Sequence, residues 1–587
     1  MAQEAKPGPS DRDLESIREA RELARAARVA QGKLAECSQE GVDRIVDAMA
    51  AAVRPHAEAL ASLAVEETGY GVVADKLQKN LFAAERVHRF IRPLKTVGVI
   101  RRRDDLGIIE IAEPFGVVAA VIPSTNPTST AIYKILIAIK ARCAIVLSPH
   151  PAAARSITRV AEIMSEAARD AGAPDHAIGW MQGVTLEGTQ ELMRHRDVAV
   201  ILATGGMGLV RAAYSAGKPA YGVGPGNAPA YVERSADVPK AVRDIVTGKT
   251  FDHGVLCSSE NSVVVDRIIA DEVRRTFEAL GGRFLSNVEI DRLSAVLVTP
   301  QRLPNPELVG KSAVTIAERA GIAVDRETRV LIAPLDGVGR DYPLSIEKLC
   351  PVLSYYTVED WREGCERCKE ILRYGGMGHT MSIHSRDDAI ILEFGLRKPA
   401  FRIVVNTPTT HGSIGLTTGL DPAMTLGCGG YGGNITSDNI SPLHLLNIKR
   451  LAYEVRPAVT LAGSEARGRD GTSRRRDGAP GISTHALNRR IDQFLASRGY
   501  RGERPDPVDE TAVPTAVPTA VPTAMPTPDE PAPGPASAEH VAVEFVCEDD
   551  VREALRTKRR IHIGVRTIIT PAARDIAEPN GVFVSVD

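Results

Sequence analysis

The chain opens with apolar and charged residues that alternate at a spacing of three to four. The stretches LESIREARELARAARVAQ and GVDRIVDAMAAAVRPHAEALASLAVEETG, within residues 10–92, show this most clearly. A period of about 3.6 residues places the apolar positions on one face of an α-helix. The pattern therefore predicts a series of amphipathic helices over residues 10–92.

The next stretch, VGVIRRRDDLGIIEIAEPFG, holds two β-rich runs on either side of Asp104, Asp105 and Gly107. Turn residues between two such runs are typical of two antiparallel strands. We predict a β-hairpin over residues 97–113.

From Gly116 the pattern changes to short, continuous apolar runs, such as GVVAAVIP, AIVLS and VAVILATGG, each followed by a helical stretch. Continuous runs suit strands that are covered on both faces, as in a parallel sheet. A second series extends from about residue 245 to 425, with the strand-like runs NSVVVD, SAVLVT, RVLIAP, VLSYYTV and FRIVVNTP. We therefore predict an α/β fold with two doubly wound parallel-sheet domains, over residues 1–230 and 231–433, and a further segment at 434–457.

Beyond Pro457 the composition changes. EARGRDGTSRRRDGAPG is basic, and TAVPTAVPTAVPTAMPTPDEPAPGPAS repeats a four-residue unit whose prolines exclude a helix or a central strand. Residues 458–587 are therefore predicted to form a flexible, Pro-rich tail. Two segments interrupt it: an amphipathic helix at 482–500 and a short helix with a β-rich piece at 540–587. The helix has a narrow apolar stripe that cannot fold alone, so we expect it to dock on a partner; its members are Leu487, Ile491, Phe494 and Leu495.

The composition and net charge limit the classes of partner that the protein could bind. The 587 residues are 43% hydrophobic and 25% charged, which allows two or three domains, and the net charge is −2. No global field favours nucleic acid or an anionic membrane, so we expect small or local partners. No apolar run approaches the roughly 20 residues that span a bilayer, and MAQEAKPGPSDRDLES lacks a hydrophobic signal core. We predict a cytoplasmic protein.

The eight cysteines show no paired framework, as expected in a reducing compartment. One CxxC motif occurs, at Cys365 and Cys368. Because no second pair or histidine cluster accompanies it, we interpret it as part of a surface helix rather than a zinc site, and we predict no metal.

Several polar and glycine-rich stretches follow the predicted strands. VIPSTNPTST holds Thr125 and Asn126 in a turn, and SPHPAA ends the next strand with His150. Glycine turns that open a helix let backbone amides approach a phosphate or a flat ring, although one such turn is weak evidence for a cofactor. The glycines singled out are Gly205, Gly206, Gly208, Gly224 and Gly226.

Cys257 stands between a glycine turn and a β-branched run, in FDHGVLCSSENSVVV. The residue type alone leaves two interpretations open. A single cysteine in such a chain is either a buried structural thiol or a reactive one.

Taken together, these stretches resemble the aldehyde dehydrogenase superfamily, and specifically its CoA-acylating branch. The likeness covers about residues 15–455 and rests on STNPTSTAIYK, LSPHPAA, ATGGMGLVRAAYSAGKPAYGVGPGN, EKLCPVLSYY, GHTMSIH and TLGCGGYGGNITSDNISPLHLLNIKR. The resemblance implies an NAD(P)-binding domain, a catalytic domain that bears the thiol, and a β-flap that builds homodimers or homotetramers. The segments at 97–113 and 434–457 suit that flap.

The resemblance also implies roles for single residues. Cys257 matches the nucleophile that attacks the aldehyde, and Asn126 matches the oxyanion position. Glu347 matches a carboxylate that holds the nicotinamide ribose, with a solvated acid beside Lys348 as the alternative. His150 falls where relatives place a residue at the adenosine ribose, and Thr125 and the five glycines are assigned to the same cofactor.

The fate of the acyl group follows from an absence. Hydrolytic relatives have a glutamate 34 positions before the nucleophile, and here that position is Val223. Valine cannot accept a proton, so water lacks its usual base and the thiol of coenzyme A is the suited acceptor. We predict oxidation of a short-chain aldehyde to acyl-CoA with NAD or NADP. The alternatives are a hydrolytic enzyme that releases the free acid, and an inactive scaffold with a targeting tail.

The proton acceptor is open at this point. His253 and His379 are candidate acids or bases, and His411 is a candidate for the substrate pocket. Each is alternatively a structural histidine. Cys350 and Cys428 are expected to be packing residues.

The tail resembles the encapsulation segments that direct aldehyde dehydrogenases into bacterial microcompartments. This resemblance implies shell proteins or other lumen enzymes as partners, and a disordered extension is the alternative. The sequence does not decide between acetaldehyde, propionaldehyde and substituted relatives. Arg155 would favour NADP if it met a 2′-phosphate, and otherwise it is a surface arginine.

Overall fold

The computed structural model describes residues 10–456 and 493, and, near the C-terminus, residues 543–546, 548–557, 559–569, 573, 576–577 and 580–585. The chain divides into two compact units, Met1–Ala466 and Arg467–Asp587, and each is described by itself.

The predicted amphipathic helices are confirmed. Ser10 caps the first of them and forms a reciprocal pair of hydrogen bonds with Asp13, which satisfies backbone groups at the helix start. Their apolar faces bury residues such as Leu34, Val42 and Met49. The helices are α1 (Asp11–Ala35), α2 (Gln39–Val53), α3 (Ala57–Thr68), α4 (Val73–Leu81) and α5 (His88–Ile91).

The first sheet has five parallel strands in the order β5-β4-β3-β6-β7. Both of its faces are covered, because alternate residues of β3 belong to two different apolar clusters, one with α6 and α7 and one with α1 and α8. The strands are β3 (Val117–Ile122), β4 (Ile145–Pro149), β5 (Ile178–Trp180), β6 (Val198–Thr204) and β7 (Ala220–Val223). The helices are α6 (Pro127–Lys140), α7 (Ala154–Asp170), α8 (Leu186–Arg194) and α9 (Met207–Tyr214).

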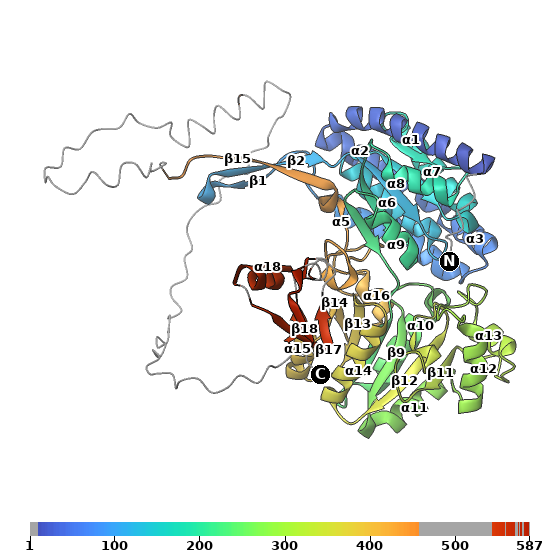
Figure 1. Ribbon diagram of the computed structural model, residues 1–587. Helices are drawn as coiled ribbons and strands as arrows, with labels where there is room; N and C mark the ends of the chain where they lie inside the picture. Colours follow the sequence, from blue (N-terminus) through green and yellow to red (C-terminus); the bar gives the residue numbers. More distant parts are fainter. Residues whose placement is uncertain are drawn as a thin grey trace, which may run out of the picture. The chain divides into compact units, whose positions relative to one another are not determined.

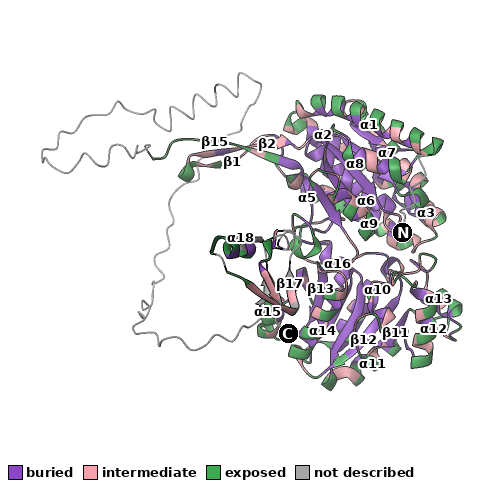
Figure 2. Cartoon of the chain, in the orientation of Figure 1, coloured by how far each residue is buried: buried purple, intermediate pink, exposed green. Residues whose placement is uncertain are grey.

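The second sheet has seven parallel strands in the order β10-β11-β12-β9-β8-β13-β14. Figure 2 shows β12 and β13 coloured as buried, as the continuous apolar runs predict. The strands are β8 (Ala228–Val232), β9 (Glu260–Asp266), β10 (Gly282–Phe284), β11 (Val330–Pro334), β12 (Val352–Val358), β13 (Gly378–His384) and β14 (Ala400–Val405). Because β8 spans residue 230, the chain changes sheets in the turn at 224–227, a few residues before the expected boundary.

Helices accompany the second sheet, as a doubly wound fold requires. They are α10 (Val238–Thr250), α11 (Ala270–Ala279), α12 (Asn287–Leu297), α13 (Ala313–Arg319), α14 (Trp361–Tyr374), α15 (Asp388–Leu396) and α16 (Thr409–Ser413). The order of elements is visible in Figure 1.

One predicted strand is wrong. The run SAVLVT lies mostly in α12, and only Val298 makes an isolated β-bridge, with Pro304. Ser286 and Glu289 form a capping box that starts the helix, and Leu293 and Leu297, four residues apart, are fully buried. A short apolar run does not by itself distinguish a strand from a buried helix face.

The CxxC motif lies in helix α14, as predicted. Its two cysteines face inward, because Cys365 and Cys368 belong to the buried cluster with Tyr356 and Phe394. Within the described residues no group of three or more His, Cys, Asp or Glu side chains could hold a metal ion.

The hairpin at 97–113 is confirmed. Strands β1 (Gly98–Arg103) and β2 (Ile108–Pro114) are antiparallel, and β15 (Leu446–Ala452) adds to β2 to complete a three-stranded sheet. This flap extends away from the helices in Figure 1. Residues 434–445 do not join it; Asn434 donates from Nδ2 to the carbonyl of Gly222 instead, over 2.8 Å.

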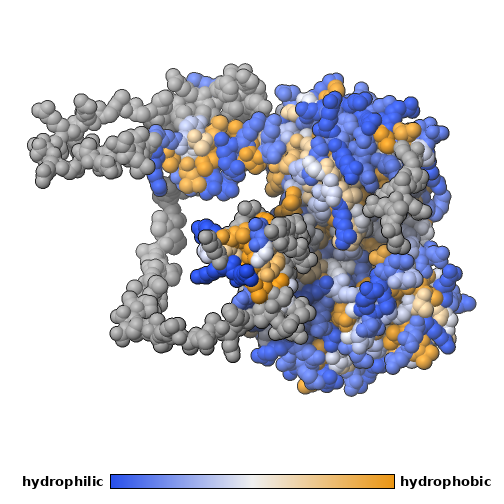
Figure 3. All heavy atoms as spheres, in the orientation of Figure 1, coloured by the Kyte–Doolittle hydropathy of each residue, from blue (hydrophilic) through white to orange (hydrophobic). Residues whose placement is uncertain are grey.

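The flap presents apolar side chains to solvent. Figure 3 shows hydrophobic atoms along it, and the exposed residues are Leu106, Leu451, Tyr453 and Val455. Exposed apolar residues on a projecting sheet are typical of a subunit contact. The homodimer or homotetramer expected here stays a prediction.

The C-terminal unit is described in part. Strands β16 (Val543–Val546), β17 (Ile561–Ile569) and β18 (Phe583–Ser585) pair in parallel, and α18 (Glu548–Thr557) lies between the first two in sequence. The predicted short helix with a β-rich piece is confirmed there. The predicted amphipathic helix at 482–500 falls outside the described residues, apart from residue 493. No helix in the described ranges is long and apolar enough to cross a bilayer.

Candidate active site

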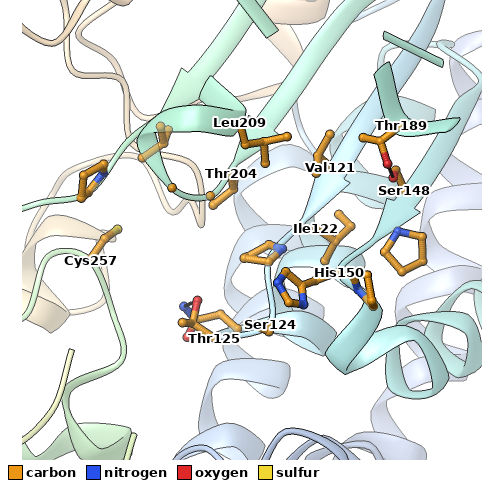
Figure 4. A pocket seen from close by; sticks show the side chains of 18 of the residues that line it. Val121, Ile122, Ser124, Thr125, Ser148, His150, Thr189, Thr204, Leu209 and Cys257 are labelled. Atoms are coloured by element: carbon orange, nitrogen blue, oxygen red, sulfur yellow. Dashed lines mark hydrogen bonds between the residues drawn. The ribbon is translucent and has the colours of Figure 1, made fainter. Parts of the chain in front are cut away.

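A cavity of about 460 Å³ opens at the carboxyl ends of the strands of the five-stranded sheet. This edge is where open α/β sheets bind ligands. Figure 4 shows Cys257 on one side of the cavity and Ile122, Thr125 and His150 on the other. Eight of the predicted site residues line it: Thr125, Asn126, His150, Gly205, Gly206, Gly224, Cys257 and Glu347.

Cys257 is half-buried and stands just before strand β9. The chain reaches it through an unusual turn, since Asp252, His253 and Gly254 all have a positive φ, of 50°, 52° and 73°. The glycine turn that contains Gly224 and Gly226 packs directly on Cys257. A Cβ on Gly226 would lie 2.0 Å from the Cys257 carbonyl oxygen, so the approach requires glycine.

The environment of Cys257 keeps the thiol protonated. Burial and, after it, the charge of Glu347 raise its pKa to about 12, although Arg402 acts in the opposite direction. The thiolate is the nucleophilic form of cysteine, and a neutral thiol becomes a thiolate only when it loses its proton. The protein by itself therefore holds Cys257 in a resting state.

We expect iodoacetamide to alkylate Cys257 about tenfold faster with each pH unit between about pH 7 and 10, because the thiolate fraction rises tenfold per unit below the pKa. Mass spectrometry of the Cys257 peptide over time measures this rate, and Cys37, also half-buried, is the internal control. A rate that levels off below about pH 9 would contradict the protonated resting state.

Asn126 lies in the loop between β3 and α6, and Pro127 begins that helix. Its side-chain oxygen accepts a hydrogen bond from Lys79 Nζ at 2.5 Å, and its Nδ2 donates to Thr125 Oγ1 at 3.2 Å. The amide thus has a defined orientation at the cavity wall that also contains Cys257.

Glu347 is part of the cavity wall. Its Oε1 accepts a hydrogen bond from the backbone N–H of Gly226 over 2.9 Å, and burial raises its pKa to about 8. The neighbouring Lys348 is fully buried and bonds to the carbonyl oxygen of Leu344. These contacts favour a group of the cavity wall over a solvated acid beside Lys348.

The part of the cavity beside the first sheet suits a dinucleotide. Gly205 and Gly206 form the turn before α9, and a Cβ on Gly206 would meet no atom within 4 Å, so a ligand has room there. The cavity lining is mainly apolar in this region, which fits a flat ring. The apolar residues are Val121, Ile122, Leu209 and Val223. Gly208 is the second residue of α9 and does not line the cavity.

Arg155 lies at the start of α7, shortly after His150, and is a surface residue. Its guanidinium reaches Glu66 at 3.4 Å, and its side chain is 65% exposed. The structure agrees with the surface interpretation and shows the guanidinium already paired.

The three candidate histidines lie outside the wall that Cys257 shares with Asn126. His253 and His411 line a second cavity of about 520 Å³, together with Asp75 and Arg329. His411 packs edge-on against Phe251, with ring centroids 4.7 Å apart. His253 and His411 therefore line the second cavity and not the one that contains Cys257.

His379 is fully buried close to the Cys257 backbone. A Cβ on Gly226 would touch both the Cys257 carbonyl and His379 Cγ, at 2.0 and 3.4 Å. The Nδ1 of His379 contacts Thr380 Oγ1 at 3.0 Å, while its Nε2 meets no hydrogen-bond partner among the described residues. Burial and Arg402 lower its pKa to about 3, so the ring is neutral. Cys350 and Cys428 are buried, as expected of packing residues.

The sequence interpretation missed Lys79, Asp252 and Arg402. Lys79 is buried in an ion pair with Asp252 and contacts Asn126, and Arg402 is the cation that lowers the Cys257 pKa. DKLQKN has Lys76 and Lys79 on one helix face, but charged residues at such spacing usually face solvent. Nothing in the sequence indicates that these two lysines are buried.

Two doubly wound sheets and a cysteine in a cavity at the strand ends define the class of protein: an α/β protein with a thiol where such sheets bind ligands. Comparison with known proteins is more specific. The model of the aldehyde dehydrogenase family matches residues 13–285. The chain belongs to the aldehyde dehydrogenase family, in its acylating branch.

Two curated relatives illustrate the match. The bifunctional aldehyde-alcohol dehydrogenase of Escherichia coli is 42% identical over 74% of this chain and 50% of its own length. The succinate-semialdehyde dehydrogenase (acetylating) of Clostridium kluyveri is 38% identical over 74% of this chain and 95% of its own. The chain thus spans about half the length of the bifunctional relatives that it matches.

Solved structures agree. An acetylating aldehyde dehydrogenase from Geobacillus thermoglucosidasius has 48% identity and a TM-score of 0.76, covering 77% of this chain and all of that one. A propionaldehyde dehydrogenase from a fucose utilisation bacterial microcompartment of Clostridium phytofermentans has 28% identity, a TM-score of 0.67, and covers 74% and 97%. A propionaldehyde dehydrogenase of Rhodopseudomonas palustris, solved with bound CoA and an acylated cysteine, has 27% identity and a TM-score of 0.66, and covers 74% and 97%.

Proposed function

We propose that this chain oxidises a short-chain aldehyde to acyl-CoA, reversibly, with a nicotinamide dinucleotide and coenzyme A. The observation that supports this most directly is the composition of the cavity wall. It combines Cys257 with Asn126 and has Val223 where hydrolytic relatives have a glutamate. Among the described lining residues, Glu347 is the only carboxylic acid.

The chain's own residues perform the first step. The Cys257 sulfur bonds to the carbonyl carbon as the π electrons of the C=O bond move to the oxygen, and the thiol proton passes to solvent, so that a thiohemiacetal anion forms on the cysteine. Asn126 Nδ2 and the Cys257 backbone N–H donate hydrogen bonds to the oxygen as its negative charge develops, and one such donor lowers the barrier by about 3 kcal/mol.

The cavity fits NAD(P), which accepts the hydride from the thiohemiacetal carbon when it is bound. Gly206 leaves the backbone accessible to it, Gly205, Gly224, Thr125 and His150 line the same space, and Glu347 belongs to the wall as a hydrogen-bonding group for a ribose. Loss of the hydride leaves an acyl thioester on Cys257.

The thioester then passes to the thiol of coenzyme A. The CoA sulfur forms a new bond to the acyl carbon, the bond to Cys257 breaks, and Cys257 leaves as a thiolate. The proton that the CoA thiol loses ends on the Cys257 sulfur, whose pKa is about 12. We propose His379, rather than His253, as the neutral hydrogen-bond acceptor that guides this transfer, because it lies beside Cys257 and its Nε2 has no partner among the described residues. We assign His411, which lines the second cavity with His253, to the aldehyde side. The Rhodopseudomonas relative, solved with CoA and an acylated cysteine, supports this order.

The experiment that tests the function measures both products. The purified chain is given acetaldehyde, propionaldehyde and their substituted relatives, each with CoA and either NAD or NADP. Equal amounts of acyl-CoA and reduced cofactor support the proposal. Free acid in equal amount to the reduced cofactor, with CoA unconsumed, would replace it with the hydrolytic alternative.

We also propose that residues 458–587 recruit the enzyme to the lumen of a bacterial microcompartment, as the sequence resemblance implies. The compartment named for the Clostridium phytofermentans relative supports this. Deleting residues 458–587 is expected to leave turnover within about twofold, since the catalytic cavity lies in the first unit, and to abolish co-sedimentation with shell proteins. Co-sedimentation that survives the deletion would overturn the targeting role.

A further inference from the structure

Two buried lysines on α4 connect the two loops that hold the reacting groups. Lys76 Nζ donates to the carbonyl of Thr125 at 3.1 Å and to Asp252 Oδ2 at 3.0 Å. Lys79 Nζ donates to Asn126 Oδ1 at 2.5 Å and also to Asp252 Oδ2. The relative exposure of Lys76, Lys79 and Asp252 is 1%, 2% and 0%. A helix far away in sequence thus bridges the Asn126 loop and the loop that leads to Cys257.

The contact between Lys79 and Asn126 distinguishes the two ends of the amide. A primary amide has an acceptor oxygen and a donor nitrogen of similar shape, whereas an ammonium group has donors alone. Burial lowers the Lys79 pKa to about 8, so at neutral pH the ammonium form prevails. Lys79 therefore pairs with Oδ1, and the reversed amide would bring N–H groups against a buried cation.

The lysine is itself fixed on its other side. Asp252 has a positive φ of 50° and accepts a hydrogen bond from the backbone N–H of Val72 at 2.7 Å. Its own N–H donates to Asp75 Oδ2, also at 2.7 Å. Gly71 makes this approach feasible, because a Cβ there would lie 1.9 Å from Asp252 Oδ1. The carboxylate that anchors Lys79 is thus held by contacts on several sides.

We propose that Lys79 is a positioning residue, which holds the Asn126 amide with its N–H group directed to the reacting oxygen. This inference rests on the proposed function, in which Asn126 donates to that oxygen. Lys79 touches neither the aldehyde nor the cofactor. It acts through Asn126, and Asp252 acts through Lys79.

A double-mutant cycle on the full chain tests the inference. Asn126→Ala is expected to lower kcat by about 100- to 1000-fold, the usual effect of losing an oxyanion donor. Lys79→Met is expected to lower kcat at least about tenfold with the aldehyde KM changed less than about threefold, because an interaction made in the transition state is weakened. The double variant should be no slower than Asn126→Ala, within about twofold, because both changes remove one interaction.

Lys76→Met is the matched control. It removes a buried cation from the same carboxylate, one turn earlier on the same helix, but its other contact is a backbone carbonyl. The double variant Lys76→Met/Asn126→Ala should lower kcat by the product of the two single effects. The effect of Lys76→Met should therefore persist when Asn126 is alanine. Thermal unfolding and cofactor binding report the fold of each variant, and Lys79→Gln, which retains a neutral donor, replaces Lys79→Met in the cycle if the latter does not fold.

The outcomes separate the two claims. If the effects of Lys79→Met and Asn126→Ala on kcat multiply in full in the double variant, the positioning role is overturned while the proposed function stands. If Asn126→Ala alone leaves kcat unchanged, the oxyanion role of Asn126 fails, and the inference about Lys79 fails with it.

Discussion

Replacing Cys257 with alanine is expected to lower the rate of aldehyde oxidation by on the order of 10⁵-fold, to the limit of detection. In the proposed mechanism the sulfur forms the bond to the aldehyde and later carries the acyl group, and alanine offers no replacement nucleophile. The remaining features of the cavity, including Asn126, bind and polarise the aldehyde without a covalent step. The measurement is the rate of NADH formation with saturating aldehyde, NAD and CoA.

Cys37→Ala is the matched control, because Cys37 is also a half-buried free cysteine but lies outside the cavity. We expect its turnover to stay within about twofold of the unchanged chain, as is usual for a substitution away from the site. Equal thermal unfolding temperatures of the two variants would exclude misfolding as the cause. Residual activity of Cys257→Ala above about one per cent, too much for loss of the nucleophile, would show that another group carries the acyl chain.

The continuous apolar runs predicted the parallel sheets well, because residues of β3 and β9 are buried on both faces. The same reasoning failed for SAVLVT, where a capped helix buries Leu293 and Leu297 through one face. Residue content alone does not report which elements surround a short apolar run. Periodicity is therefore decisive in long helices such as α1, and ambiguous in runs of five or six residues.

The site was predictable where chemistry and turn geometry are local. Thr125, Asn126 and His150 follow β3 and β4, and the carboxyl ends of adjacent parallel strands meet at one edge. Glu347, about 90 residues after Cys257, was placed by the resemblance alone.

Contacts across the fold were beyond the sequence. The pairing of Lys79 with Asn126 joins residues 47 positions apart, and Lys79 with Asp252 joins residues 173 apart. Their burial depends on how α4 packs, which no local pattern contains. Likewise, the packing of His379 near Cys257 depends on the register between β13 and β8.

In the absence of CoA, we expect the enzyme to form about one equivalent of NADH per active site and then to slow by at least about 100-fold, because the acyl thioester has an acceptor only when the second thiol is present. Rapid mixing with aldehyde and NAD, followed by absorbance of NADH, measures the burst. Mass spectrometry should find the acyl group on the peptide that contains Cys257. Addition of CoA should then restore turnover and release acyl-CoA.

The stall has a structural cause that a substitution can remove. Water in the cavity needs a base, yet Val223 cannot accept a proton, and the one carboxyl among the described lining residues, Glu347, has its Oε1 engaged by the backbone N–H of Gly226. Val223→Glu restores a carboxyl at the end of β7, within the wall shared with Cys257. We expect this variant to release free acid without CoA, faster at higher pH as the buried carboxyl ionises, and Val223→Gln, of similar size but without a base, to remain stalled. Continuous NADH formation by the unchanged chain without CoA would show that water reaches the thioester by another route, and would contradict the acylating mechanism.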